Sequence, residues 1–103
     1  MDEITINLQT KQATLEAYLP FIKNGALKIH CLKVLTLNQH LKVSLSFPEI
    51  RRVYAVQGVV VWIEKTSDPQ KGDLYGIQFM GEQAKEIHKT IENYLAGLLH
   101  YDR

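Results

Sequence analysis

The chain has 103 residues, of which 46% are hydrophobic and 22% are charged, an ordinary composition for a globular protein with one core. The formal net charge of +1 gives no electrostatic reason to expect binding to nucleic acid or to an anionic membrane. No apolar run is long enough to span a bilayer. We therefore expect a single domain over residues 1–103, with no nucleic-acid partner and no direct membrane insertion.

The first residues and the cysteine content indicate a compartment. Met1-Asp2-Glu3 is acidic, and the charged-then-apolar pattern of a signal peptide does not follow it. Cys31 is the one cysteine of the sequence, so it cannot form an internal disulfide. These features predict a cytoplasmic protein.

The chain is predicted to begin with a strand, a helix and a hairpin. Ile4–Leu8 alternates apolar and polar residues, as a strand with one buried face does. Thr10–Leu19 has apolar residues at helical spacing, which predicts a short helix, and Pro20 cannot continue it.

A tight turn is expected next. Asn24-Gly25 is the strongest hairpin signal of the sequence, because both residues tolerate the positive φ of a type I′ turn. We expect the arms of this hairpin to be Phe21-Ile22 and Ala26–Ile29.

Three further strands are predicted in the middle of the chain. Leu41–Phe47 alternates strictly and is ended by Pro48. Val53–Ile63 is too long and too apolar to alternate cleanly, and Gly58 in its middle predicts a bend or a bulge. Leu74–Met80 is the last strand. We expect Val43, Leu45 and Phe47 to face inward, and Tyr75, Ile77 and Phe79 to share one side of the last strand.

From Glu82 onward the apolar residues repeat at steps of three and four, which predicts an amphipathic helix over Glu82–Leu99. Tyr94, Leu98, Leu99 and Tyr101 extend its apolar character past one stripe, which makes the helix a second candidate surface for a partner, but we expect these residues to pack across the mouth of a barrel. Short strands followed by one helix predict a mainly β fold: a small antiparallel β-barrel with a short N-terminal helix and a C-terminal amphipathic helix. The apolar stripe of that last helix consists of Ala84, Ile87, Ile91, Leu95 and Leu98.

We find no constellation of residues for catalysis. None of the four histidines stands at the i,i+4 spacing of a helical metal pair, and no glycine-rich loop could cradle phosphate. His30 and Cys31 are adjacent, so on a strand they would point to opposite faces. We expect a protein that is not an enzyme, with no catalytic residues, no cofactor and no metal site.

Four segments in order carry a family resemblance. "AYLPFIKNGAL" beginning at Ala17, followed by "GVVVWI", "YGIQF" and "IENYLAGLL", resembles the PilZ family, specifically the stand-alone type IV pilus PilZ proteins. The resemblance covers about Leu15 to Leu99. It implies a β-barrel with a C-terminal helix, which agrees with the fold expected from the pattern.

Many PilZ domains bind cyclic di-GMP through an N-terminal Arg-x-x-x-Arg and an Asp/Asn-x-Ser-x-x-Gly on the following hairpin. This chain has three arginines, Arg51, Arg52 and Arg103, and none of them precedes the hairpin. Aligning the final Gly of the second motif with Ala26 puts Phe21 and Lys23 at its acidic and Ser positions, and aligning it with Gly25 puts Pro20 and Ile22 there. Lysine does not replace the planar fork of arginine. We therefore expect no direct binding of cyclic di-GMP. The alternative is a receptor that holds this nucleotide through other cations, for which the candidates are Lys11, Lys23, Arg51 and Arg52.

Aromatic residues near the helix-to-hairpin junction suggest a different site. Tyr18, Pro20 and Phe21 cluster there, and Trp62 lies near the end of a long strand. They could be core residues, since a domain of this size needs aromatic volume, or they could form a protein-binding patch. The resemblance favours the patch, because pilus PilZ proteins are adaptors whose partners are the type IV pilus extension ATPase (PilB type) and, in some bacteria, a FimX-type GGDEF-EAL protein. The family's ATPase contact maps onto Tyr18 and Trp62. We therefore predict an adaptor for type IV pilus biogenesis and twitching motility with protein-binding residues Tyr18, Pro20, Phe21 and Trp62.

Overall fold

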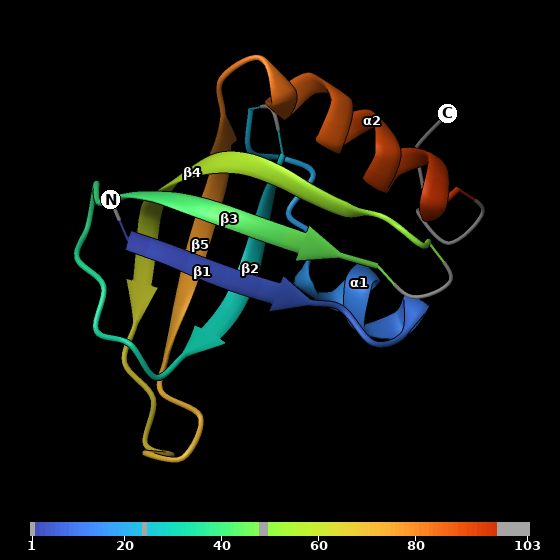
Figure 1. Cartoon of the computed structure of the whole chain (residues 1–103). Helices are drawn as coiled ribbons and strands as arrows, with labels where there is room; N and C mark the ends of the chain where they lie inside the picture. Colours follow the sequence, from blue (N-terminus) through green and yellow to red (C-terminus); the bar gives the residue numbers. More distant parts are fainter. Residues whose placement is uncertain (1, 24, 48–49, 97–103) are drawn as a thin grey trace.

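The computed structural model describes residues 2–23, 25–47 and 50–96 (Figure 1). A strongly curled sheet forms the body of the molecule, and both helices lie toward the right of the view, the C-terminal one above the N-terminal one. In chain order the elements are β1 (Asp2–Asn7), α1 (Lys11–Ala17), β2 (Ala26–Cys31), β3 (His40–Ser46), β4 (Val53–Glu64), β5 (Asp73–Met80) and α2 (Gln83–Tyr94). Helix α2 packs on β4 and β5, and helix α1 packs beside β2.

The sheet has five strands in the order β1-β3-β4-β5-β2. The pairs β3–β4, β4–β5 and β2–β5 are antiparallel, as expected, whereas β1 and β3 run parallel. The parallel pair is possible because α1 and β2 lie between these strands in sequence and supply the long crossover that parallel strands require. The structure confirms the predicted mainly β fold with an N-terminal and a C-terminal helix, in the form of a curled half-barrel.

The inward faces of the strands build the core. The predicted inward residues of β3 and the predicted common side of β5 are confirmed, since all six are at most 5% exposed. Alternation placed them correctly because one face of each of these strands is buried. These residues are Val43, Leu45, Phe47, Tyr75, Ile77 and Phe79.

Helix α1 is shorter than expected and ends at Ala17 rather than Leu19. It begins after Thr10, whose Oγ1 accepts a hydrogen bond from the Ala13 N–H at 2.9 Å, the usual way of satisfying a free N–H at a helix start. Tyr18 has extended backbone angles, φ −77° and ψ 133°. The residue before a proline is also biased away from helical geometry, so the chain leaves the helix two residues early.

The prediction of a hairpin with the arms Phe21-Ile22 and Ala26–Ile29 is wrong. Phe21-Ile22 forms no strand, because the Ile22 N–H donates to the Leu19 carbonyl at 3.4 Å and the Gly25 N–H donates to the Ile22 carbonyl at 2.8 Å, which makes two consecutive turns. Gly25 has the predicted positive φ, 79°, and Asn24 lies outside the described residues. The strand β2 pairs with β5 instead.

The start of β2 is held to the end of α1 by two short contacts. Tyr18 and Leu27 form an isolated antiparallel bridge, and the Leu19 N–H donates to the Ala26 carbonyl at 2.9 Å. The four residues Pro20–Lys23 therefore form a loop at the edge of the sheet, in which Pro20, Phe21 and Lys23 are exposed and Ile22 is half-buried.

The irregularity in β4 lies at a different residue from the one expected. The register between β4 and β5 shifts between Val60 and Trp62, whereas Gly58 pairs in regular register. Gly58 is needed for space: a Cβ there would lie 2.6 Å from Ile77 Cγ2 and 3.1 Å from Val43 Cγ2, inside the core. The glycine thus marks a close approach of packed residues, and the bulge follows it.

The C-terminal helix α2 covers one end of the core through its apolar stripe. Ala84, Ile87, Ile91 and Leu95 are at most 1% exposed, which confirms this part of the predicted stripe. The ring centroids of Tyr94 and Phe47 lie 5.9 Å apart, so Tyr94 packs on the barrel end. Within the described residues, no helix is long and apolar enough to cross a membrane. Predictions for Pro48, Leu98, Leu99 and Tyr101 fall outside the described residues.

Candidate protein-binding site

Three strands place Lys28, Gly76 and Trp62 in one row on the outer face of the sheet. Gly76 pairs with Lys28 of β2 on one side and with Trp62 of β4 on the other. A Cβ on Gly76 would lie 3.2 Å from Trp62 Cβ and 3.3 Å from Trp62 Cε3, so the absence of a side chain lets the indole lie close to the β5 backbone. The row therefore has a lysine at one end, an indole at the other, and a gap between them.

The bulge in β4 adds a second apolar side chain beside the indole. Val61 is the extra residue between Val60, which pairs with Ile77, and Trp62, which pairs with Gly76. A bulge bends the strand locally and re-aims side chains. Val60 is fully buried, whereas Val61 is half-buried and Trp62 is 38% exposed. The strand thus turns from lining the core to lining the outer surface at this point.

The loop after α1 forms the opposite wall. Phe21 is the most exposed large apolar residue among those described, at 81%, and Leu19 and Ile22 are half-buried beside it. The loop is tied to the sheet because Gln78 Nε2, on the outer face of β5, donates to the Lys23 carbonyl at 2.9 Å. This bond positions the loop relative to the strand row.

Together these elements enclose an open hollow of about 560 Å³. Five of its lining side chains are apolar, two of them aromatic, and the one charged group is the Lys28 ammonium. Large exposed aromatic side chains with polar groups close to them are typical of the centres of protein interfaces. The lining residues are Leu19, Phe21, Ile22, Lys28, Val61, Trp62 and Gln78.

The structure corrects the expectation that Tyr18 lies in an exposed patch with Trp62. Tyr18 is only 4% exposed and belongs to the core. Its hydroxyl lies 3.2 Å from His88 Nδ1 on α2. The Tyr18 backbone is bridged to Leu27, and Tyr18 Cε1 would lie 3.4 Å from a Cβ on Gly25. Of the four predicted residues, Phe21 and Trp62 line the hollow, while Pro20 is exposed in the loop without lining it.

Several lining residues were not predicted. Lys28 could have been found, because it alternates with the buried Leu27 on a predicted strand and so had to face outward. Gln78 follows from the same rule on β5. Val61 had no signal in the sequence, since the bulge was expected at Gly58. Leu19 and Ile22 were assigned to a helix and to a hairpin arm, and neither element includes them.

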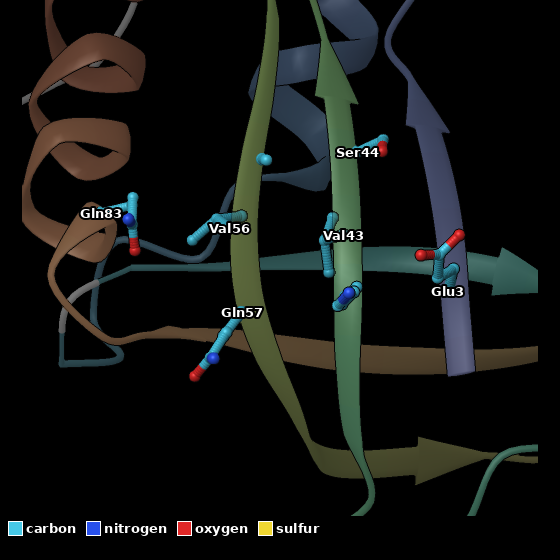
Figure 2. A pocket seen from close by; sticks show the side chains of 8 residues that line it. Glu3, Val43, Ser44, Val56, Gln57 and Gln83 are labelled. Carbon is cyan, nitrogen blue, oxygen red and sulfur yellow. The ribbon is translucent and has the colours of Figure 1, made fainter. Parts of the chain in front are cut away.

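A second hollow, of about 340 Å³, lies on the outer face of β1, β3 and β4 next to the start of α2 (Figure 2). It has polar groups such as Glu3, Ser44, Gln57 and Gln83, and it has no aromatic residue in its lining. A hollow of this kind offers hydrogen bonds without a large apolar anchor. It therefore suits a protein partner less well than the first hollow.

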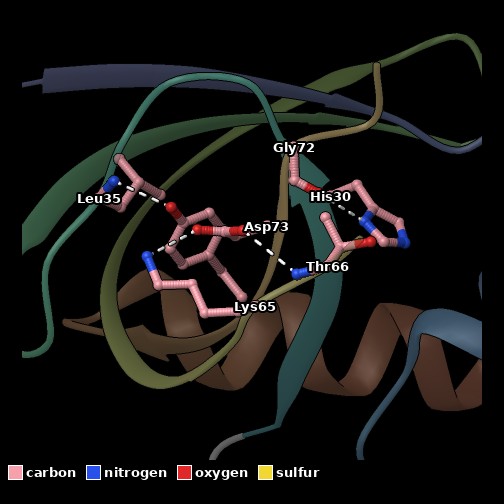
Figure 3. A network of polar contacts seen from close by, with 7 residues as sticks. His30, Leu35, Lys65, Thr66, Gly72 and Asp73 are labelled. Atoms are coloured by element: carbon pink, nitrogen blue, oxygen red, sulfur yellow. Dashed lines mark hydrogen bonds and ion pairs between the residues drawn. The ribbon is translucent and has the colours of Figure 1, made fainter. Parts of the chain in front are cut away.

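A polar network closes the loop between β4 and β5 (Figure 3). Lys65 Nζ lies 3.0 Å from Asp73 Oδ2, and the Thr66 N–H donates to Asp73 Oδ1 at 3.3 Å. The hydrogen bond from Lys65 lowers the pKa of the Asp73 carboxyl below its ordinary value, and the same bond raises the pKa of Lys65. Tyr75 accepts a hydrogen bond from the Leu35 N–H at 3.1 Å, which anchors the loop after β2. These contacts are structural.

The cations considered for an alternative nucleotide site are not gathered around one hollow. Lys11 Nζ lies 5.0 Å from the centre of the Tyr94 ring, and Arg52 Cζ lies 4.4 Å from the centre of the Tyr54 ring. Arg52 also pairs with an acidic residue of α2, at 3.1 Å. Neither hollow described above is lined by any of the four candidates Lys11, Lys23, Arg51 and Arg52.

Within residues 2–23, 25–47 and 50–96, no group of three or more His, Cys, Asp or Glu side chains could hold a metal ion. His30 is exposed and Cys31 is half-buried on β2.

Comparison with known protein families identifies the family of this chain. The family model described as PilZ domain matches residues 3–97, which take in both helices and nearly the whole of the sheet. No curated protein matches the chain.

Proposed function

The chain belongs to the PilZ domain family, and from this premise we propose that it is a non-enzymatic adaptor for type IV pilus biogenesis and twitching motility. PilZ domains are generally non-catalytic domains that bind cyclic di-GMP or act as adaptors. In the proposed mechanism the apolar hollow binds the pilus extension ATPase (PilB type) by protein–protein contact. A second-messenger signal reaches the complex through a partner of the FimX type, which binds the nucleotide itself.

One observation carries this proposal: the segment that aligns with the family's nucleotide motif lines an apolar hollow. In the two possible registers, the acidic and Ser positions of that motif fall on Phe21 and Lys23 or on Pro20 and Ile22. Phe21 and Ile22 line the hollow, and neither can hydrogen-bond a guanine edge or a phosphate. The same place on the fold therefore offers apolar contact area instead of polar recognition.

The exposure of these side chains also favours a protein partner. An aromatic residue gains about 25 cal/mol for each Å² of apolar surface that leaves water. Phe21 at 81% exposed and Trp62 at 38% exposed have surface left to bury. Tryptophan is among the residues most enriched in interface hot spots, where truncation to alanine costs about 2 kcal/mol or more.

Calorimetric titration of the domain with the pilus extension ATPase tests the proposal. We expect Trp62→Ala to weaken binding by about 30-fold, which corresponds to a hot-spot loss of about 2 kcal/mol. Phe21→Ala should weaken it as well. Val53→Ala is the matched control, because Val53 is a 67% exposed apolar residue that does not line the hollow. If both hollow variants remain folded and bind the ATPase as the unchanged domain does, the docking assignment is overturned.

The second candidate function is a cyclic di-GMP receptor that binds through non-standard residues. The observation in its favour is the Trp62 indole with Lys28 across the Gly76 gap, since a base can stack on an indole while a lysine attracts a phosphate. Against it, the ligand carries two phosphates and two guanines, and the hollow has a single cation. Cyclic di-GMP titrated into the same preparation should give no heat. A low-micromolar affinity for the nucleotide would favour the receptor.

A further inference from the structure

Lys28 is a half-buried cation in the wall of the apolar hollow. Within the described part of the chain, its ammonium makes no hydrogen bond and no ion pair, in contrast to Lys65, which is paired with Asp73. The ammonium therefore stands at the wall of an apolar hollow without a counter-ion among the described residues, and a carboxylate brought into the hollow gains a charge-assisted hydrogen bond from it.

Among residues 2–23, 25–47 and 50–96, no acidic side chain lines this hollow. The other six residues that line the hollow are uncharged. Glu16 and Lys28 both line a separate hollow of about 320 Å³. Glu16 instead accepts a hydrogen bond from Gln12 Nε2 at 3.2 Å.

We propose that the hollow selects a partner segment in which an acidic side chain stands next to an apolar anchor, with the carboxylate on Lys28 and the anchor against Trp62. This inference rests on the proposed function and names the chemistry of the partner at the same site. Lys28 acts as a specificity-determining residue, and the apolar wall supplies the contact area.

The strand row sets the spacing that the partner must have. Lys28 and Trp62 are both register partners of Gly76, so their backbones are two strand spacings apart, about 9–10 Å. The Trp62 ring lies close to Gly76, because a Cβ there would be 3.3 Å from Trp62 Cε3, and Lys28 pairs with Gly76 from the other neighbouring strand. Residues three or four apart on a helix have Cβ atoms about 5–6 Å apart, which lets an acidic and an apolar side chain of one helical turn reach the two ends of the row.

The ATPase titration separates this inference from the function on which it rests. We expect Lys28→Glu to weaken ATPase binding by about tenfold or more, and Lys28→Met to weaken it less while removing most of its dependence on salt. Lys85→Glu is the control, because it makes the same change in net charge at an exposed position on α2. If Trp62→Ala loses affinity and Lys28→Glu does not, the inference fails and the docking surface stands. If neither variant changes binding, both fail.

Selection of short random peptides on the purified domain tests the partner chemistry without the ATPase. We expect enriched peptides to carry Asp or Glu within four residues of an aromatic residue or a leucine. The Lys28→Glu domain should enrich Lys or Arg at that place instead. The same peptides enriched on both domains would overturn the proposal, and so would enriched peptides with no acidic residue.

Discussion

Replacing Tyr18 separates its role in the core from a role in binding. The ring is 4% exposed and packs in the core beside Leu27. Removing a buried aromatic ring costs about 3–5 kcal/mol, because the lost burial is added to the cavity that remains. A domain of this kind has about 5–15 kcal/mol of stability in total. We therefore expect Tyr18→Ala to be strongly destabilised.

Tyr18→Phe isolates the hydroxyl contribution. The ring stays in place, and the variant loses the contact between the hydroxyl and His88 Nδ1, which are 3.2 Å apart. A hydrogen bond of this type contributes about 0.5–1.5 kcal/mol net. His88 has a partly exposed side chain, so its ring nitrogen can bond to water once the hydroxyl is gone. The expected loss is therefore at the lower end of this range.

Urea unfolding followed by far-ultraviolet circular dichroism measures both effects. With a slope of about 1.5 kcal/mol per molar urea, the alanine variant should lose about 2 M or more from its midpoint, and the phenylalanine variant less than 1 M. Phe21→Ala is the control, since an 81% exposed ring contributes little to folding. A Tyr18→Ala domain within about 1 kcal/mol of the unchanged protein would refute the assignment of Tyr18 to the core.

Three further substitutions probe the sheet and its loop. Gly58→Ala puts a Cβ 2.6 Å from Ile77 Cγ2 and should cost about 1–3 kcal/mol, seen as a lower Tm in thermal unfolding; an unchanged Tm contradicts the close approach. Gly76→Ala puts a Cβ 3.2 Å from Trp62 Cβ, so it should displace the indole and weaken ATPase binding in a folded domain, and unchanged binding counts against the strand row as the floor of the site. Asp73→Asn removes a carboxyl whose pKa is lowered in the folded protein. The ionised carboxyl stabilises the fold at pH values above its ordinary pKa, and this stabilisation is lost as the pH falls through the pKa that the carboxyl has in the folded protein. The variant should therefore lose less stability than the unchanged protein on acidification below about pH 4. Urea unfolding at several pH values measures this, and curves of unfolding free energy against pH that run parallel for the two proteins would show that the pair with Lys65 has no such effect.

Local patterns predicted the elements whose burial repeats regularly. The alternation in β3 and β5 and the three-and-four spacing in α2 each describe one buried face, so Leu45, Ile77 and Ile87 were placed correctly from their neighbours in sequence. The same local signals failed where a distant strand decides the geometry. The turn signal at Asn24-Gly25 predicted a hairpin, but β2 pairs with β5, which follows it by more than forty residues in the chain.

The site was only partly predictable for the same reason. Phe21 and Trp62 could be identified as aromatic residues near turns and strand ends. The hollow also depends on Val61, which reaches the surface through a bulge between β4 and β5, and on Gly76, which leaves room for the indole. Both features belong to the pairing of two strands rather than to either segment alone. Tyr18 was assigned to the surface because its burial depends on the bridge to Leu27 and on the contact with His88.

The docking surface is tested most directly by nuclear magnetic resonance of the ¹⁵N-labelled domain titrated with unlabelled pilus extension ATPase. The chain has one tryptophan, so Trp62 gives a single indole N–H signal from the lining of the proposed site. We predict that this signal and the amides of Leu19, Ile22 and Lys28 shift or broaden at the lowest ATPase ratios. An unchanged Trp62 indole, with the first changes around Gln57 in the hollow of Figure 2, would contradict the proposal.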